Sequence, residues 1–511
     1  MSGRDEEAVT GDERDALLTI ARGAAVTAGG VSGQRILITA AEYVLARGLG
    51  PMAYGVYALT WRIAQVLVRL VTFGSVPALQ RYLPAYESEP KRQSRVVGLA
   101  YATTVGFGLL MGVGLLVLAP WINEHTVDDA AFPPAMRLFG GLILLIGFVM
   151  IYAGTFRAVG SARGEVLFNK LLRPAMRLLG AVVALTVGYS VVGVAGTIVV
   201  CMALLVIVGY PITERLTGIR PSLRVSRHAV SQFYNHAAPV AMSSLGKIFQ
   251  NRVDVLLVAA LLTTVATGIY NVILVLVAIA WIPLLSFNQL LPPVASDLHA
   301  SNQIETLNAV YASVTRLIVT TVIPILAVQF VFGRELLALF GPTYTEGYLA
   351  LVVYLGGVFV GSAVGATGWL LMMTDHQYAR MGLDWLLAVS NVILTYIFIQ
   401  TFGLVGAALG TALATSVQNG LQVLLLRRFE GLWPFDRTFL TPLAAGVVMV
   451  IAMSGIRSVA GGLLSLGLGI AVGLPLYIAS LKFIGVAPSD RFVAQELSTT
   501  VRSRFATRWP F

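Results

Sequence analysis

Polar side chains recur at helical spacing inside three apolar segments of the sequence. They form three sets: Arg35, Thr39 and Glu42; Arg62, Gln65, Arg69 and Thr72; and Ser244, Lys247, Asn251 and Asp254, with Arg252 beside the last set. Intervals of three, four and seven residues return to the same face of an α-helix, so each set predicts one polar stripe. Ionisable groups within apolar segments usually face a cavity or one another.

The net positive charge of these polar stripes indicates what kind of ligand they could bind. Cations outnumber carboxylates, and the acids within apolar segments are few: Glu42, Asp254 and Asp384. Arginine offers phosphate two parallel donors, so a cavity lined in this way suits a multiply charged anion. A second interpretation stays open, in which the cations form structural ion pairs or extend to the membrane surface. The candidate pairs are Arg35 with Glu42 and Arg252 with Asp254.

The chain lacks the sequence signatures of enzymes and of metal or nucleotide sites. It has neither a P-loop lysine motif nor an HExxH motif, its five histidines show no ligand spacing, and Cys201 is its single cysteine. We therefore expect no catalytic residue, no cofactor and no metal. The net charge of +10 comes mostly from short basic loops, which indicates orientation in a membrane rather than binding of nucleic acid.

These stripes must be positioned by membrane-spanning helices. Hydrophobic residues make up 57% of the 511 residues, charged residues 12%, and the mean hydropathy is +0.80. Such values are typical of an integral membrane protein. A helix crosses the membrane with about 20 apolar residues, and fourteen segments qualify. They are 20–46, 54–76, 96–119, 136–157, 167–188, 191–212, 237–262, 267–292, 312–333, 347–373, 382–402, 404–426, 439–457 and 462–484. We predict an all-α integral membrane protein.

The loops between the segments differ in charge. Basic residues gather in alternate loops, at 81–95, 157–173, 215–227, 380 and 427–437, and in the tail from 491, whereas the 120–135 loop carries Glu124, Asp128 and Asp129. The positive-inside rule therefore predicts both termini on the cytoplasmic side of the cytoplasmic membrane. The acidic start, MSGRDEEAVTGDERDA, lacks the basic region of a cleaved signal peptide.

One further basic stripe opens the fifth segment. It consists of Lys170, Arg173 and Arg177. Because it begins at the predicted cytoplasmic boundary, we assign it to contact with lipid headgroups, with substrate entry as the alternative.

An internal repeat predicts two related halves. Gly55-Val56-Tyr57 recurs as Gly268-Ile269-Tyr270, and Val192-Gly193 recurs as Val405-Gly406, both at an offset of 213 residues. This offset fits two six-helix lobes of the same orientation, related by an axis along the membrane normal, with two appended helices. The predicted domains are an acidic cytoplasmic tail (1–19), an N-lobe (20–213), a cytoplasmic linker (214–236), a C-lobe (237–428), two further helices (439–484) and a basic cytoplasmic tail (485–511).

Several motifs, in order, resemble a known family. LGPMAYGVYAL and ALQRYLPAYES, then KIFQNRVDVLLVA, GIYNVILVL and QLLPPVASDL, and finally FGLVGAALGTALA resemble the polysaccharide-export flippases (Wzx-type polysaccharide biosynthesis transporters) of the MOP/MATE-like superfamily. The resemblance covers about residues 20–430. It implies a MATE-like fold and the movement of a lipid-linked sugar or oligosaccharide to the outer leaflet by alternating access, for surface polysaccharide or glycoprotein glycan assembly. The lipid would be a polyprenyl or dolichyl phosphate or pyrophosphate.

The resemblance also implies roles for residues. In the lipid II flippase branch, arginines of the first, second and eighth helices line the headgroup cavity. Here the first role falls to Arg35 and the second to Arg62 or Arg69. The eighth segment has no arginine, and Arg252 in the seventh is the nearest substitute. Taken with the three stripes, the candidate substrate-binding residues are Arg35, Glu42, Arg62, Gln65, Arg69, Lys247, Asn251, Arg252 and Asp254. The last two helices could form a groove for the lipid tail.

Two other functions stay open. A cation-coupled multidrug exporter of the same superfamily would use an acid such as Asp254 for coupling. A membrane glycan polymerase or ligase would use external acids such as Asp128 and Asp129 to hold a divalent metal. For the flippase, the expected partners are membrane lipid, the lipid-linked saccharide and glycan-assembly enzymes. The energy source stays open between the membrane potential, a coupling cation and downstream consumption.

Overall fold

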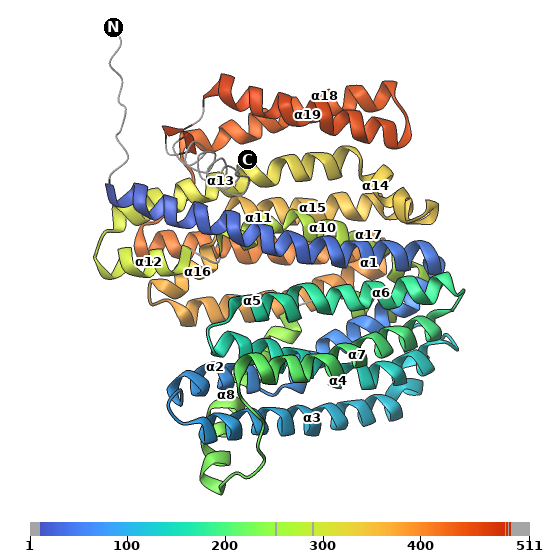
Figure 1. Ribbon diagram of the computed structural model, residues 1–511. Coiled ribbons are helices and arrows are strands. Elements are labelled where there is room, and N and C mark those ends of the chain that lie inside the picture. Colours follow the sequence, from blue (N-terminus) through green and yellow to red (C-terminus); the bar gives the residue numbers. More distant parts are fainter. Residues whose placement is uncertain (1–10, 251–252, 289–290, 486, 489, 492–511) are drawn as a thin grey trace, which may run out of the picture. The chain divides into compact units, whose positions relative to one another are not determined.

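The structure is a computed structural model that describes residues 11–250, 253–288, 291–485, 487–488 and 490–491. Within these ranges the side chains of 11–13, 15, 21–30, 162 and 243–250 are not described. The regular elements of the described residues are helices (Figure 1). The chain divides into two compact units. The first unit holds residues 32–275 and 339–346, and the second holds 276–338, 347–511 and the residues up to 31.

The first unit contains most of α1 (Gly11–Val71), a helix of 61 residues that bends at Gly50. Gly50 has a φ of 78° and precedes Pro51. Glycine takes up this left-handed conformation without the steric cost of a Cβ atom, and proline removes a backbone donor from the helix. The bend separates two apolar stretches, in agreement with the predicted boundary between segments 20–46 and 54–76.

The other helices of the first unit follow in chain order. They are α2 (Ser75–Ala85), α3 (Pro90–Glu124), α4 (Phe132–Ala158), α5 (Ala162–Glu165), the π-helix η1 (Val166–Leu172), α6 (Arg173–Thr186), α7 (Val191–Thr217), α8 (Arg227–Gln250), α9 (Val253–Leu261) and most of α10 (Thr264–Ala280), with the short 3-10 helix η2 (Pro342–Gly347) added from later in the chain. The helices α3, α4, α7 and α6 pack successively against one another (Figure 1). Gly112 on α3 meets Gly140 on α4 so closely that a Cβ atom on Gly112 would lie 3.2 Å from the Gly140 carbonyl oxygen. Small residues of this kind allow membrane helices to approach.

The second unit continues the chain. Its helices are α11 (Ile282–Phe287), α12 (Leu291–Ala300), α13 (Ile304–Val331), α14 (Gly333–Phe340), α15 (Tyr348–Ala363), α16 (Thr367–Met373), α17 (Gln377–Glu430), η3 (Arg437–Phe439), α18 (Leu440–Val459) and α19 (Gly462–Ile484). Like α1, α17 is interrupted by a glycine, Gly403, with a φ of 56°. The helices α18 and α19 form a hairpin beside α13 (Figure 1). Phe332, Met449 and Tyr477 pack together there.

A buried arginine fastens the end of the described chain to this unit. Arg316 on α13 is 3% exposed. Its Nε and Nη2 atoms donate to the two carboxylate oxygens of Asp490, at 2.7 and 2.9 Å, and its Nη1 donates to Asp436 and to Thr438. The guanidinium therefore joins α13, the entry to α18 and the segment that follows α19.

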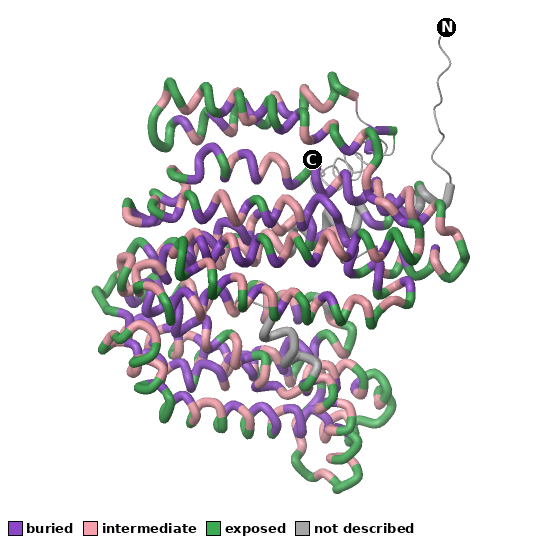
Figure 2. The backbone as a smooth tube through the Cα atoms, turned by 180° about the vertical axis from the view of Figure 1, so that it is seen from behind, coloured by how far each residue is buried: buried purple, intermediate pink, exposed green. Residues whose placement is uncertain are grey.

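The surface of the helices is largely apolar. Among the described residues, nine helical stretches are long and apolar enough to cross a membrane, and two of them, Val31–Ala85 and Gln377–Glu430, have 55 and 54 residues. Large apolar side chains are exposed along α3, for example Leu110 at 66% and Val117 at 70%. Figure 2 marks exposed residues in green on many of the helices. Such surface is unfavourable in water and favourable against lipid. The protein is an all-helical, multi-pass membrane protein.

Candidate functional site

A continuous hydrogen-bonded network lies inside the first unit, and Glu42 is at its centre. The Glu42 carboxylate, on the first half of α1, is 5% exposed. It accepts a hydrogen bond from Arg177 Nη2 on α6 at 2.9 Å and another from the Tyr54 hydroxyl at 2.8 Å. Burial of a carboxylate is tolerated when a cation and hydrogen-bond donors surround it, as here.

Arg177 contacts two aromatic side chains in addition to Glu42. Its Nε donates to the Tyr57 hydroxyl at 2.9 Å, and its guanidinium carbon lies 3.9 Å from the centre of the Trp61 ring. Arg177 is 3% exposed. A stacked guanidinium paired with a carboxylate is a strongly fixed arrangement. The prediction that Arg177 contacts lipid headgroups is therefore wrong, because this side chain faces the interior of the unit.

Asn271 on α10 extends the network to Arg62. Its Nδ2 donates to the Tyr54 hydroxyl at 2.5 Å, and its Oδ1 accepts from Arg62 Nη2 at 2.8 Å. Arg62 is 9% exposed and also donates, through Nη1, to Gln65 at 3.3 Å. The Tyr54 hydroxyl both donates and accepts, so two cations at opposite ends of the network are linked through one carboxylate, one phenol and one amide.

Asp254 is in a separate buried contact. It is 2% exposed, and its Oδ2 accepts from the Tyr270 hydroxyl on α10 at 2.7 Å. Tyr57 and Tyr270 are the tyrosines of the repeated Gly-X-Tyr motif. Each of them therefore meets a charged side chain of a neighbouring helix, Arg177 in the first copy and Asp254 in the second.

The glycines of the same motif bring the two helices together. A Cβ atom on Gly55 of α1 would lie 2.0 Å from the carbonyl oxygen of Thr264, and one on Gly268 of α10 would lie 2.6 Å from that of Pro51. No side chain fits in either place. The close crossing of α1 and α10 places Tyr54 within reach of Asn271.

The remaining predicted residues are distributed as follows. Gln65 and Arg69 are exposed on the second half of α1, and Arg35 is half-buried on the first half. Asp384 accepts from Arg380 and Gln418, at 2.9 and 2.8 Å, within the second unit. Lys247 lies in the part of α8 whose side chains are not described, and Asn251 and Arg252 lie outside the described residues.

Four members of the network are not among the predicted site residues: Tyr54, Tyr57, Arg177 and Asn271. Asn271 directly follows the repeated Gly-Ile-Tyr, and Tyr54 precedes Tyr57 by three residues on the same helical face. The position of Tyr54 and Asn271 beside a repeated motif is the signal in the sequence that could have identified them.

Two histidines, His299 and His376, contact the Glu430 carboxylate, at 3.3 and 3.4 Å. In the part of the chain that the structure describes, no cluster of three or more potential ligand side chains could hold a metal.

Solved structures share this fold. The chain aligns, with a TM-score of 0.68 and 17% identity, to an inward-facing multidrug resistance MATE family transporter of the MOP superfamily, over 78% of this chain and 94% of that one. It also aligns, with a TM-score of 0.66 and 13% identity, to the lipid II flippase MurJ in an inward closed conformation, over 90% of this chain and 98% of that one. The fold is that of the MATE and MurJ transporters.

The sequence then defines the family. Residues 44–351, more than half of the chain, match the family described as "Polysaccharide biosynthesis protein". The chain belongs to this family, so the resemblance seen in its motifs is confirmed. Families with this sequence pattern and fold are transporters and not enzymes.

Two proteins of Haloferax volcanii are similar at 24% identity. One is described as "Probable low-salt glycan biosynthesis flippase Agl15", matched over 261 residues, 50% of this chain and 54% of that protein. The other is described as "Probable flippase AglR", matched over 395 residues, 73% of this chain and 76% of that protein. The chain thus matches about half the length of the first relative and three quarters of the second.

Proposed function

We propose that this protein flips a polyprenyl- or dolichyl-(pyro)phosphate-linked sugar or oligosaccharide from the cytoplasmic to the outer leaflet of the cytoplasmic membrane. The observation that carries the proposal is the family match over residues 44–351, supported by two relatives described as probable flippases, one of them of glycan biosynthesis. The flipped product would serve surface polysaccharide or glycoprotein glycan assembly.

The proposed site for the phosphate is the cationic face of α1 that includes Arg62 and Arg69. Arg62 is oriented by Asn271 and Gln65, so its guanidinium is fixed before a ligand arrives. Preorganised donors lose little entropy on binding, and guanidinium geometry matches phosphate oxygens. Arg35 on the first half of α1 and Lys247, Asn251 and Arg252 complete the proposed set, with Glu42 and Asp254 as its acceptors.

We further propose fourteen crossings. The two bent helices α1 and α17 would each cross twice, and α5–α6, α8–α9, α10–α11 and α15–α16 would each act together as one crossing. The lobes would be 20–213 and 237–428, joined by 214–236 and followed by 439–484, which would hold the lipid tail. Rocking of two such lobes gives alternating access. Moving one net charge through the membrane potential is worth about 2.3 kcal/mol per 100 mV, so a charged carrier cycle would respond to that potential.

Lipid analysis of a deletion strain tests the function. We expect lipid-linked saccharide to accumulate in the inner leaflet and surface glycan to be lost. Normal surface glycans in the deletion strain would refute the proposal that the protein is a flippase. Altered drug resistance with normal glycans would instead identify an exporter.

Complementation of that strain tests the site. We expect Arg62→Ala to abolish glycan export and Arg62→Lys to restore it only in part, because lysine keeps the charge but not the paired donors. The matched control is Arg163→Lys at an exposed position outside the network. Full export by Arg62→Ala, at wild-type protein level, would show that Arg62 is not part of the binding site. It would not contradict the proposed transport function.

A further inference from the structure

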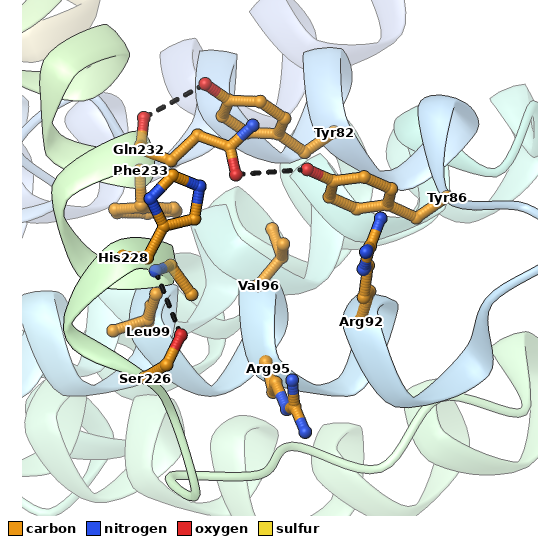
Figure 3. Close-up of a pocket in the computed structure, with 11 residues that line it drawn as sticks. Tyr82, Tyr86, Arg92, Arg95, Val96, Leu99, Ser226, His228, Gln232 and Phe233 are labelled. Carbon is orange, nitrogen blue, oxygen red and sulfur yellow. Dashed lines mark hydrogen bonds between the residues drawn. The ribbon is translucent and has the colours of Figure 1, made fainter.

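A second polar site lies apart from the buried network. A pocket of about 290 Å³ opens where the end of α2, the start of α3 and the start of α8 meet (Figure 3). None of the side chains of the Glu42 network lines it. Its volume is at the small end of the range of ligand sites, about 300–1,000 Å³. It therefore suits a small group rather than an oligosaccharide.

The charged residues that line the pocket are basic. Arg92 and Arg95 reach it from α3 and His228 from α8, and no lining residue is acidic. Arg92 is exposed and paired with Glu89 at 2.9 Å. Arg95 is half-buried, and among the described residues it makes no hydrogen bond or ion pair. A half-buried guanidinium beside a cavity is positioned to bind an anion there.

Two tyrosines form one wall. The rings of Tyr82 and Tyr86 stack with centroids 6.0 Å apart and planes 9° apart. Their hydroxyls donate to the backbone oxygen of Gln232 at 3.0 Å and to its side-chain Oε1 at 3.3 Å. Because these bonds join α2 to α8, the wall is fixed in the absence of a ligand, and binding would cost little conformational entropy.

The chain leading into α8 is also fixed. The Ser222 amide donates to the Ser94 carbonyl oxygen on α3 at 2.9 Å. A Cβ atom on Gly98 would lie 2.1 Å from the Ser222 carbonyl oxygen, so this extended stretch lies directly against α3. At its end, Ser226 caps α8 by accepting from the Ala229 amide at 3.2 Å. This docking holds the start of α8, which carries His228, beside α3.

We propose that this pocket binds a phosphate group. Arg95 would supply the paired donors, His228 a second polar contact from the facing helix, and the Tyr82–Tyr86 wall an aromatic side for the organic part of the ligand. Buried Leu99 and Phe233 give the pocket an apolar base. The phosphate can come from the headgroup of an anionic lipid or from a soluble phosphate, and both sources share this chemistry.

Binding to the full-length chain, purified in a neutral detergent, tests the proposal. The two probes are short-chain phosphatidylglycerol and inorganic pyrophosphate, followed by native mass spectrometry and titration calorimetry. We expect Arg95→Gln to weaken binding about tenfold or more, the loss typical of a hydrogen bond to a charged group. Its control, Arg224→Gln, removes an exposed arginine from the stretch that leads into α8. Arg224 does not line the pocket, so this variant should bind the probes within about twofold of wild type.

A second matched pair keeps the test valid if Arg95→Gln fails to fold. His228→Glu places a carboxylate at an exposed position of the pocket, whereas Arg227→Glu does so one residue away and outside it. Arg227→Glu changes the net charge by more than His228→Glu does. A greater loss of probe binding in His228→Glu would therefore show that the probe binds in the pocket. Equal losses in the two variants, or no binding of either probe by wild type, would overturn the proposal.

The probes also separate the two sources. Binding of phosphatidylglycerol without competition by pyrophosphate assigns the pocket to a lipid headgroup. Competition by pyrophosphate, with the same dependence on Arg95, assigns it to soluble phosphate. Neither result depends on whether the protein is a flippase.

Discussion

Glu42 and Arg177 form an ion pair whose side chains are 6% and 4% exposed. Desolvating two charges is costly, and their mutual attraction offsets this cost only while both are present. Removing one partner would leave the other buried and uncompensated. The pair therefore has a structural role within the site, since it fixes the Tyr54 hydroxyl that Asn271 and, through it, Arg62 depend on.

We expect Glu42→Gln or Arg177→Gln to destabilise the folded protein by about 3–5 kcal/mol. Thermal unfolding followed by size-exclusion chromatography would measure the effect. The double variant should recover part of the loss, because no unpaired charge remains. The control is Glu89→Gln, which breaks the exposed pair with Arg92, where 45% and 56% of the side chains are accessible, and should cost less than about 1 kcal/mol. Similar unfolding temperatures for Glu42→Gln and Glu89→Gln would contradict the structural role.

Residue spacing predicted the stripes on α1 but not their partners. Glu42 and Arg62 stand out because a polar group within an apolar helix is visible in local sequence. Arg177 is 135 positions from Glu42 and Asn271 is 209 from Arg62, and periodicity carries no information at that range. Arg177 was also misassigned because it shares a helical face with Lys170 and Arg173, yet it lies one turn deeper than Arg173 and turns inward.

At the scale of elements, the crossing of α1 and α10 depends on two glycines. Gly55 and Gly268 belong to the repeated motif, and each leaves room for the backbone of the opposite helix. Other glycines are in open space: a Cβ atom on Gly106 of α3 would have no neighbour within 4 Å. Gly55 and Gly106 are both helical glycines, and they differ in the space around their Cα atoms.

We expect Gly55→Ala to push α1 and α10 apart, with a loss of about 1–3 kcal/mol as is typical of overpacking. Gly106→Ala should be neutral or slightly stabilising, because alanine favours a helix by about 1 kcal/mol over glycine. The unfolding temperatures of the two variants, compared with that of the wild type, measure this difference in stability. Equal stability of Gly55→Ala and Gly106→Ala would show that the helices do not approach as described.

Hydropathy divides the two longest helices, α1 and α17, into two segments each, and it misses the short elements. The bends at Gly50 and Gly403 fall at predicted segment boundaries, because a long apolar run must be divided to fit the membrane. Hydropathy predicts no helix at the amphipathic α2, because its 11 residues are too few for a crossing and include polar side chains. The π-helix η1 has no such signature in hydropathy, which follows composition and not backbone geometry.

At the scale of the whole molecule, orientation in the membrane is still a prediction. It is based on the basic loops, whose charge favours the cytoplasmic side. The two ends of α3 offer a direct comparison, because Lys91 and Glu124 are both exposed and lie at opposite ends of one helix. The chain has one cysteine, Cys201, so Cys201→Ser provides a background free of thiols.

In that background we expect Glu124→Cys to react with a membrane-impermeant maleimide on intact cells. Lys91→Cys should react only after the cells are permeabilised, because its end of α3 carries the basic loop. Gel-shift labelling measures both. The reverse pattern would place the termini outside and would invert the direction of transport proposed above.

Trp61 has a practical value because of its position. Its ring faces the Arg177 guanidinium at 3.9 Å and the Phe139 ring at 5.8 Å. Indole emission is sensitive to a nearby cation, and the chain has seven tryptophans. With the other six replaced by phenylalanine, Trp61 would act as an intrinsic fluorophore at the contact between α1 and α6. Its spectrum would then report, without any attached label, whether this contact is kept or broken as the carrier turns over.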